Sequence, residues 1–202
     1  MKPEIEVKFL QVDHDVLRAK LTSLGAECAQ PMRLMKRKTY DFPDYRLRNE
    51  KNGWARVRDE GDKVTMSYKQ LNDRTLHGTH EVNVVVDSFD AADAFLQELG
   101  LEPKSYIETK RESWRLDDFE IELDEWPWAL PYIEIEGPDE QSLLELALKL
   151  GFNWDVAFYG SVEVVYQAEY DVTEDEINDV SRITFEDQVP DLFEARRLMD
   201  KA

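Results

Sequence analysis

The sequence contains very little cysteine and no long apolar segment. Its single cysteine, Cys28, cannot form a disulfide within the chain, which fits a reducing compartment. No run of about 18 apolar residues is present, so the sequence predicts no membrane-spanning helix. The N-terminus also lacks the apolar core of a secretion signal. These absences indicate a cytoplasmic protein without a membrane partner.

Basic residues are scarce relative to acidic ones. The 202 residues include 25 Lys and Arg against 44 Asp and Glu, which gives a net charge of −19. Such a balance argues against nucleic acid as a partner. The three histidines show no spacing typical of a zinc site. Since 42% of the residues are hydrophobic, the length suits a sizeable folded core.

Alternating polar and apolar residues predict strands along most of the first 137 residues. Helices are expected from Asp13 to Gly25, over 89–99, and over 140–150 after an N-cap at Asp139, while 43–52 is expected to be a loop. Short connections between strands favour an α+β fold, an eight-stranded antiparallel β-barrel with helices packed outside. The expected strands are 3–10, 31–42, 53–59, 63–70, 77–87, 104–117, 119–126 and 131–137.

The C-terminal part differs in composition from the segments before it. It is acidic and mainly helical in pattern, and Thr173 with Glu176 forms a capping-box signature. A final helix is expected over 190–201. The chain therefore divides into a barrel domain, 1–170, and an acidic helical extension, 171–202. The sequence leaves open whether this extension packs on the barrel or forms a tail.

Charged residues recur on one face of the predicted strands. The default interpretation is a solvated outer face; the alternative is an inverted barrel with a charged lumen. Bases cluster on early and middle strands and acids on the first and last strands, which are neighbours in a closed barrel, so the alternative is favoured. One wall would then suit a divalent cation and the other a polyanion. The bases are Lys8, Lys36, Lys38, Arg56, Arg58, Lys69 and Arg111, and the acids are Glu4, Glu6, Glu122, Asp124, Glu134 and Glu136.

The order of these charged motifs resembles the CYTH superfamily, the triphosphate tunnel metalloenzymes. That family includes class IV adenylate cyclases, thiamine triphosphatases and inorganic triphosphatases. The resemblance covers about residues 1–166 and implies an antiparallel tunnel that binds a triphosphate with Mg²⁺ or Mn²⁺. The motifs are Glu4-x-Glu6-x-Lys8, Arg56-x-Arg58, Lys69 in MSYKQ, Arg111, Asp124 in IELDEW, and Glu134-x-Glu136.

The resemblance also implies a role for each matched position. Tyr40, in KTYDF, is similar to a tyrosine that pairs with the motif lysine in thiamine triphosphatases, so Lys8 and Tyr40 are the expected catalytic residues. Thr109 stands where many relatives have a lysine. The implied substrate ligands are Lys8, Arg56, Arg58, Lys69 and Arg111, and the implied metal ligands are Glu4, Glu6, Asp124, Glu134 and Glu136.

Three functions remain open at this point. The first is metal-dependent hydrolysis of inorganic triphosphate, ATP or thiamine triphosphate. The second is a class IV-like adenylate cyclase, and the third is a module that binds polyphosphate or nucleotide without turnover. The cyclases have a His-Phe pair before the opening motif, whereas only Met1–Pro3 precede it here, which favours hydrolysis. The protein is expected to act alone or as a homodimer.

Overall fold

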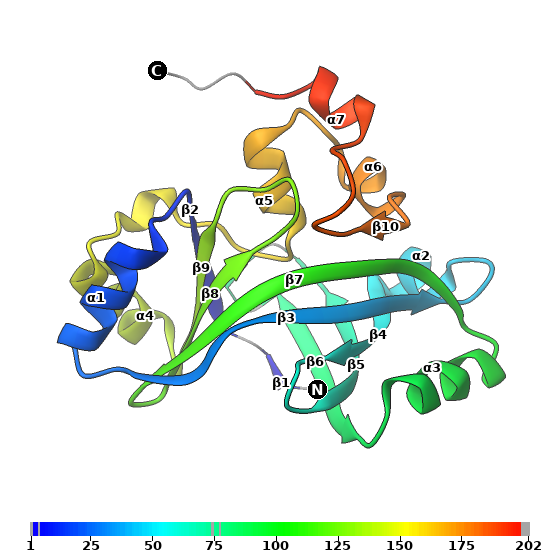
Figure 1. Cartoon of the computed structure of the whole chain (residues 1–202), viewed down its shortest axis with the longest axis horizontal. Coiled ribbons are helices and arrows are strands. Elements are labelled where there is room, and N and C mark those ends of the chain that lie inside the picture. Colours follow the sequence, from blue (N-terminus) through cyan, green and yellow to red (C-terminus); the bar gives the residue numbers. More distant parts are fainter. Residues whose placement is uncertain (1, 4, 74, 77, 199–202) are drawn as a thin grey trace.

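The computed structural model describes residues 2–3, 5–73, 75–76 and 78–198 (Figure 1). The strands are β1 (Lys2–Pro3), β2 (Glu6–Leu10), β3 (Glu27–Asp41), β4 (Gly53–Asp59), β5 (Val64–Leu71), β6 (Thr79–Val86), β7 (Glu102–Leu116), β8 (Phe119–Glu125), β9 (Tyr132–Glu136) and β10 (Arg182–Ile183). The helices are α1 (His14–Ser23), α2 (Arg46–Lys51), α3 (Phe89–Glu98), α4 (Glu140–Leu150), the 3₁₀ turn η1 (Trp154–Val156), α5 (Glu163–Glu169), α6 (Glu174–Asn178) and α7 (Asp191–Ala195).

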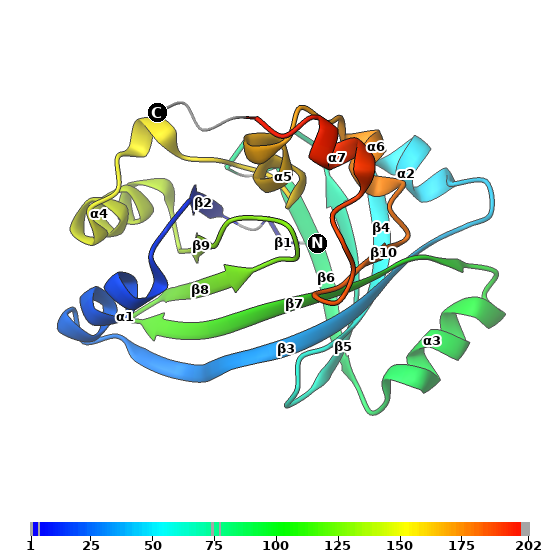
Figure 2. The same cartoon turned by 45° about the horizontal axis from the view of Figure 1, so that its top comes forward.

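The long strands form one curled antiparallel sheet. Its order is β1-β6-β5-β4-β3-β7-β8-β9-β2, so β1 and β2 lie at its two ends. Pro3 and Glu6, which belong to those end strands, are three residues apart and therefore at most about 11 Å from each other. The sheet consequently curls round on itself, as Figures 1 and 2 show. The predicted α+β antiparallel barrel with outer helices is confirmed as a curled half-barrel.

Local capping explains why several helices begin and end where the sequence predicts. The carboxylate of Asp13 accepts the backbone N–H groups of Asp15 and Val16 at the start of α1. Asp139 caps α4 in the same way. Gly151 follows α4 with φ of +86°, a conformation that glycine adopts without steric cost.

Helix α2 lies in a segment that the sequence predicts as a loop. Its N-cap residue, Tyr45, makes no capping hydrogen bond with its side chain. Instead, the buried carboxylate of Asp41, at the end of β3, accepts the N–H groups of Leu47 and Arg48 at 3.0 and 2.9 Å. The expectation for 43–52 was wrong because this cap lies outside the local capping pattern.

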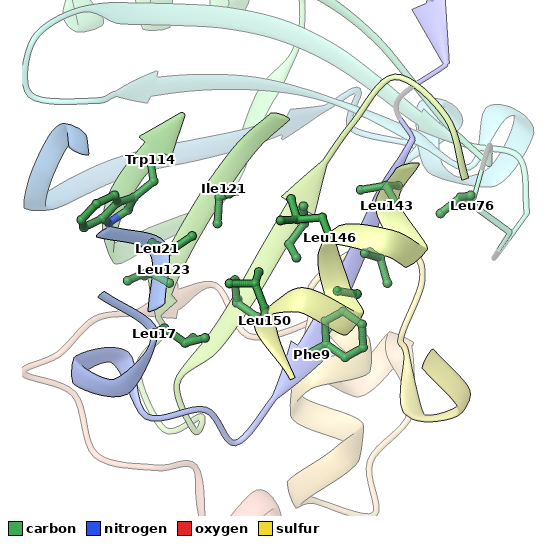
Figure 3. Packing of buried hydrophobic residues seen from close by; sticks show 14 residues of the cluster. Phe9, Leu17, Leu21, Leu76, Trp114, Ile121, Leu123, Leu143, Leu146 and Leu150 are labelled. Carbon is green, nitrogen blue, oxygen red and sulfur yellow. The ribbon is translucent and has the colours of Figure 1, made fainter. Parts of the chain in front are cut away.

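The outer face of the sheet is apolar and is covered by helices. Ile121 of β8, Ile133 of β9 and Leu21 of α1 are fully buried in one cluster, where Leu146 of α4 is 3% exposed. Figure 3 shows Ile121, Leu21 and Leu146 in this cluster. Each such side chain contributes about 1.5–3 kcal/mol by burial. Since neighbouring residues of a strand point to opposite faces, this packing turns the charged residues of β2, β8 and β9 into the lumen.

The segment after α4 packs on the sheet. Phe193 of α7 is 1% exposed and lies in a core with Trp126, Tyr166 and Ile177. Helix α7 is shorter than the predicted 190–201, because the chain turns at Arg196 and Arg197 forms a β-bridge with Tyr170; residues 199–201 lie outside the described residues. Residues 171–198 therefore pack on the barrel and do not form a tail. The division into two domains at residue 170 stays a prediction. In the described part of the chain, no helix is long and apolar enough to span a membrane.

Candidate active site

Two cavities occupy the lumen of the curled sheet. We call the first, of about 290 Å³, the roofed chamber; Trp126, Tyr166 and Ile177 are among its walls. We call the second, of about 410 Å³, the polar chamber; Glu60, Glu122 and Glu136 are among its walls. The two cavities share six charged residues, here named the shared ring, and we infer from this that they are the halves of one tunnel. The shared ring consists of Glu6, Arg56, Arg58, Lys69, Arg111 and Glu134.

Strand register brings the acidic wall together. Lys8 of β2 lies opposite Glu134 of β9, which in turn lies opposite Glu122 of β8. One step along, Glu6 pairs with Glu136. Directly opposed residues have Cβ atoms about 5 Å apart, so these residues form a compact patch although they come from distant parts of the chain.

Lys8 is buried in this patch and held by two carboxylates. Its Nζ lies 3.0 Å from Glu6 Oε1 and 2.9 Å from Glu134 Oε2. Burial lowers the pKa of Lys8, but the two carboxylates more than offset it, so the pKa is raised above its ordinary value. These contacts favour the ammonium form of Lys8, which can donate hydrogen bonds to phosphate or water.

Arg111 is oriented by a fully buried aspartate. Its Nε and Nη2 donate to the two oxygens of Asp124 at 2.7 and 2.5 Å, and Nη2 also lies 3.3 Å from Glu134 Oε1. Burial lowers the pKa of Arg111, yet Asp124, Glu122 and Glu134 raise it well above its ordinary value. Asp124 is 0% exposed and borders neither chamber. The structure thus places Asp124 behind Arg111 and not at the tunnel surface, where the expected metal ligand would lie.

The opposite wall carries Arg56, Arg58 and Lys69, as the sequence predicts. Arg56 Nη2 donates to Glu81 Oε1 at 3.0 Å, and Lys69 Nζ lies 3.4 Å from Glu81 Oε2. Arg58 donates through Nε and Nη2 to Glu60 at 3.0 and 2.6 Å. Burial and the neighbouring arginines lower the pKa of Arg56 well below its ordinary value. A polyanion placed here would relieve that repulsion.

Arg37 of β3 also belongs to this wall, although the sequence analysis missed it. Its Nη2 donates to Thr109 at 3.1 Å, its guanidinium lies 4.5 Å from the Trp126 ring centroid, and its Nε has no hydrogen-bond partner among the described residues. Burial, Arg58 and Arg111 lower its pKa to about 10. Lys36 and Lys38, which were expected on the basic wall, border neither chamber; Lys38 pairs with Asp93 of α3 at 2.5 Å. The alternation of side chains along β3 could have indicated this, because Arg37 points to the opposite face of the strand from Lys36 and Lys38.

Tyr40 shares the outward face with Lys38. Its hydroxyl donates to Asp93 Oδ1 at 2.8 Å, and its ring packs beneath α3 with Val57 and Leu96. Burial and Asp93 raise the pKa of Tyr40. The hydroxyl of Tyr40 is thus bound to α3, while Tyr40 and Lys8 both border the roofed chamber; the expected pairing of Tyr40 with Lys8 stays a prediction.

The carboxylates of the tunnel provide the oxygen donors that a hard divalent cation prefers. Burial and then repulsion from Glu6, Glu120 and Glu134 raise the pKa of Glu136, although Lys69 opposes the shift. Burial raises the pKa of Glu122 to about 7 despite Arg111. Among the described residues no three carboxylates converge on one point. Glu4, another expected ligand, lies outside them.

Comparisons with known proteins agree with this architecture. The family model of the CYTH domain matches residues 2–157, so the chain belongs to the CYTH family. A comparison with curated proteins finds no significant match.

Solved structures with the same fold come from distant organisms. The PH1012 protein of Pyrococcus horikoshii has a TM-score of 0.65 at 19% identity, over 80% of this chain and 98% of that one. A candidate adenylate cyclase of Vibrio parahaemolyticus has a TM-score of 0.69 at 16% identity, over 82% and 98%. The adenylyl cyclase candidate HpAC1 of Hippeastrum, described as having a dominant triphosphatase activity, has a TM-score of 0.59 at 15% identity, over 92% and 100%. At these identities the similarity shows the fold.

Proposed function

We propose that the protein is an enzyme that hydrolyses a triphosphate in its tunnel with the help of a divalent cation. The observation that carries the proposal is the shared ring, where cations of β4, β5 and β7 and carboxylates of β2 and β9 line both of two adjoining cavities. A wall of guanidinium groups suits a linear triphosphate, because these groups bind phosphate oxygens bidentately.

The basic wall would bind the phosphates. Arg56 and Arg58 are the expected ligands from β4, with Lys69 beside them on β5 and Arg111 across the lumen. We add Arg37, because its unpartnered Nε lies in a buried position beside the roofed chamber. Phosphoryl transfer depends mainly on positioning and on neutralising charge, and these side chains are held in place by Glu60, Glu81 and Asp124.

The proposal places Mg²⁺ or Mn²⁺ at the acidic patch because its carboxylates supply oxygen donors, although no three of them converge on one point among the described residues. The residues that would hold it are Glu6, Glu134 and Glu136, whose oxygens border the tunnel; Glu4 remains a candidate ligand from the sequence. When bound, the cation would neutralise charge on the reacting phosphate. Lys8, an ammonium in contact with Glu6 and Glu134, would then be released to hold a phosphate oxygen or the attacking water.

Reaction in ¹⁸O-labelled water tests the proposal. Purified protein is incubated with tripolyphosphate or ATP and either cation, and the products are separated. Label in the released phosphate supports hydrolysis. Cyclic AMP with unlabelled pyrophosphate would establish the cyclase instead, and intact triphosphate that binds with metal would establish a binding module. Since Cys28 is an exposed free thiol, we expect the enzyme to work in the reducing cytoplasm.

A further inference from the structure

One edge of the curled sheet lies open along most of β6. On one side, β6 pairs with β5 over its whole length, from Thr79 to Val86. On the other side, among the described residues, β6 pairs only with the two-residue strand β1, at His80 and Glu81. Within the part of the chain that the structure describes, residues 82–86 therefore have no strand beside this edge. Their outward backbone N–H and C=O groups can pair with a further strand.

Solvent reaches both faces of this segment. A strand with one packed face alternates buried and exposed residues, yet Val82, Asn83, Val84 and Val85 are all exposed. The three valines are 49%, 46% and 70% exposed. The segment is therefore accessible to another chain along its edge and on both faces.

The segment also lacks the features that usually keep edge strands apart. Native edge strands commonly carry lysine, proline or a bulge, each of which discourages pairing with another chain. Residues 82–86 read VNVVV, without charge or proline, and their pairing with β5 shows no register shift. The whole chain has a net charge of −19. Five uncharged residues with high strand propensity on an open edge of such a protein indicate an interaction surface.

The order of residues along this edge fits a second copy of the same strand. We consider antiparallel pairing about a two-fold axis that passes through Val85. This axis places Val85 opposite itself, Val84 opposite Val86, and Asn83 opposite Asp87 of the other copy. Directly opposed side chains lie on the same face of a sheet, so the amide of Asn83 can donate to the carboxylate of Asp87. Each contact occurs twice, as two-fold symmetry requires.

Neighbouring registers fit less well. An axis at Val84 would place Glu81 directly opposite Asp87, and opposed like charges are destabilising. An axis at Asn83 would pair the second copy with His80 and Glu81, where β1 already lies. An axis at Val86 would draw the first residue of α3, Phe89, into the paired segment. The register centred on Val85 avoids all three conflicts.

We propose that the protein forms a symmetric dimer in which the open edges of two β6 strands pair as antiparallel strands centred on Val85. The partner is thus a second copy of this chain, and the two curled sheets become one continuous sheet. Asn83 borders the polar chamber, so the second copy extends one wall of that chamber beyond the edge. This surface lies outside the shared ring, and the dimer does not depend on the proposed function.

Cysteine cross-linking tests the register. Cys28→Ser first removes the exposed native thiol. In that background, Val85→Cys places two cysteines opposite each other across the axis, where Cα atoms of antiparallel strands lie about 4.5–5.5 Å apart, within the range of a disulfide. Val82→Cys is the matched control, because the two copies of residue 82 lie about 20 Å apart in this register. Oxidation by air with copper phenanthroline and non-reducing electrophoresis detect the covalent dimer.

Sedimentation equilibrium measures the association without cross-linking. The wild-type chain is examined at concentrations up to about 1 mM, so that a weak dimer is also detected. Val85→Lys opposes two like charges at the axis and should weaken the dimer at least about tenfold in Kd. Val16→Lys is the control, since Val16 on α1 is 51% exposed. Added salt should strengthen the wild-type dimer, because it screens the repulsion between two acidic copies. Circular dichroism verifies that each variant is folded.

We expect a covalent dimer from Val85→Cys and none from Val82→Cys, together with a wild-type dimer that Val85→Lys weakens and Val16→Lys does not. A wild-type chain that stays monomeric throughout the concentration range would overturn the inference. Equal cross-linking through both cysteines, or a dimer that Val85→Lys leaves unchanged, would place the contact on another surface and would overturn it as well. If Val85→Lys does not fold, the pair of cysteine variants still decides the register.

Discussion

Replacing Arg56 by methionine should change stability and ligand binding in opposite directions. The Arg56 side chain is 7% exposed, and burial, Arg58, Arg37 and Arg111 all lower its pKa. It makes one hydrogen bond, from Nη2 to Glu81, and its Nε has no partner among the described residues. The free protein therefore bears the cost of a buried, incompletely satisfied cation in a repulsive surrounding.

The expected magnitudes follow from these contacts. Methionine removes the charge but keeps much of the side-chain volume, and Glu81 keeps its contact with Lys69 at 3.4 Å, so no acid is left unpaired. Apolar replacement of a buried ion is often neutral or stabilising, so the free energy of unfolding should fall by less than about 1 kcal/mol or rise. Triphosphate binding should lose about 1.5–3 kcal/mol, the range for a charge-assisted hydrogen bond, which is about 10–150-fold in Kd.

Urea unfolding of the free protein and calorimetric titration with tripolyphosphate and Mg²⁺ measure the two effects separately. Lys149→Met, on the exposed side of α4, is the control for removal of one positive charge. Arg56→Lys should restore part of the binding, because an ammonium cannot make the planar fork. A large loss of stability with unchanged affinity would refute the reasoning and make Arg56 a structural residue.

Three further changes test other parts of the site. Glu134→Gln should weaken Mn²⁺ binding severalfold in a titration, whereas Glu145→Gln on α4 should not; equal affinity of both variants would contradict the metal assignment. Asp124→Asn should destabilise the protein by about 3–5 kcal/mol in urea unfolding, because it breaks a buried ion pair, and it should cut activity by releasing Arg111; wild-type stability would show that the pair is dispensable. Lys38, Tyr40 and Gln97 contact Asp93 and, despite burial, hold its pKa below the ordinary 3.8. Its stabilisation is thus complete above about pH 4 and is lost as the pH falls through the lower folded-state pKa. Asp93→Asn should therefore be less stable near neutral pH and should lose less stability on acidification, and parallel pH curves for the two proteins would disprove this.

The sequence predicts the strands and the orientation of most tunnel residues because both depend on local alternation. Arg56 and Arg58 share a face with Trp54, and the three border the tunnel as their parity requires. The caps at Asp13 and Asp139 likewise lie beside the helices that they start. In such segments each residue's environment is determined by its immediate neighbours.

The parts that the sequence analysis missed depend on contacts between distant residues. In residues 36–38 three consecutive bases occupy both faces of β3, so charge alone cannot show which face points inward. The structure decides it through Asp93 of α3, which binds Lys38 and Tyr40 from outside and leaves Arg37 inside. The role of Asp124 is hidden for a similar reason, since only the register of β7 and β8 places it directly against Arg111.

The proposed function requires one tunnel to bind a cation and a polyanion together, and the arrangement of the two walls favours this. Arg37, Arg56 and Arg58 crowd one wall, while Glu120, Glu136 and their neighbours crowd the other. Within each wall the like charges repel one another. The fold is stabilised instead by the apolar outer face of the sheet, which packs under α1, α3 and α4. A cation bound alone would neutralise only the acids, and a triphosphate alone only the bases. Their joint binding relieves both repulsions and places positive metal against negative phosphate across the shared ring, so we infer that each increases the affinity for the other.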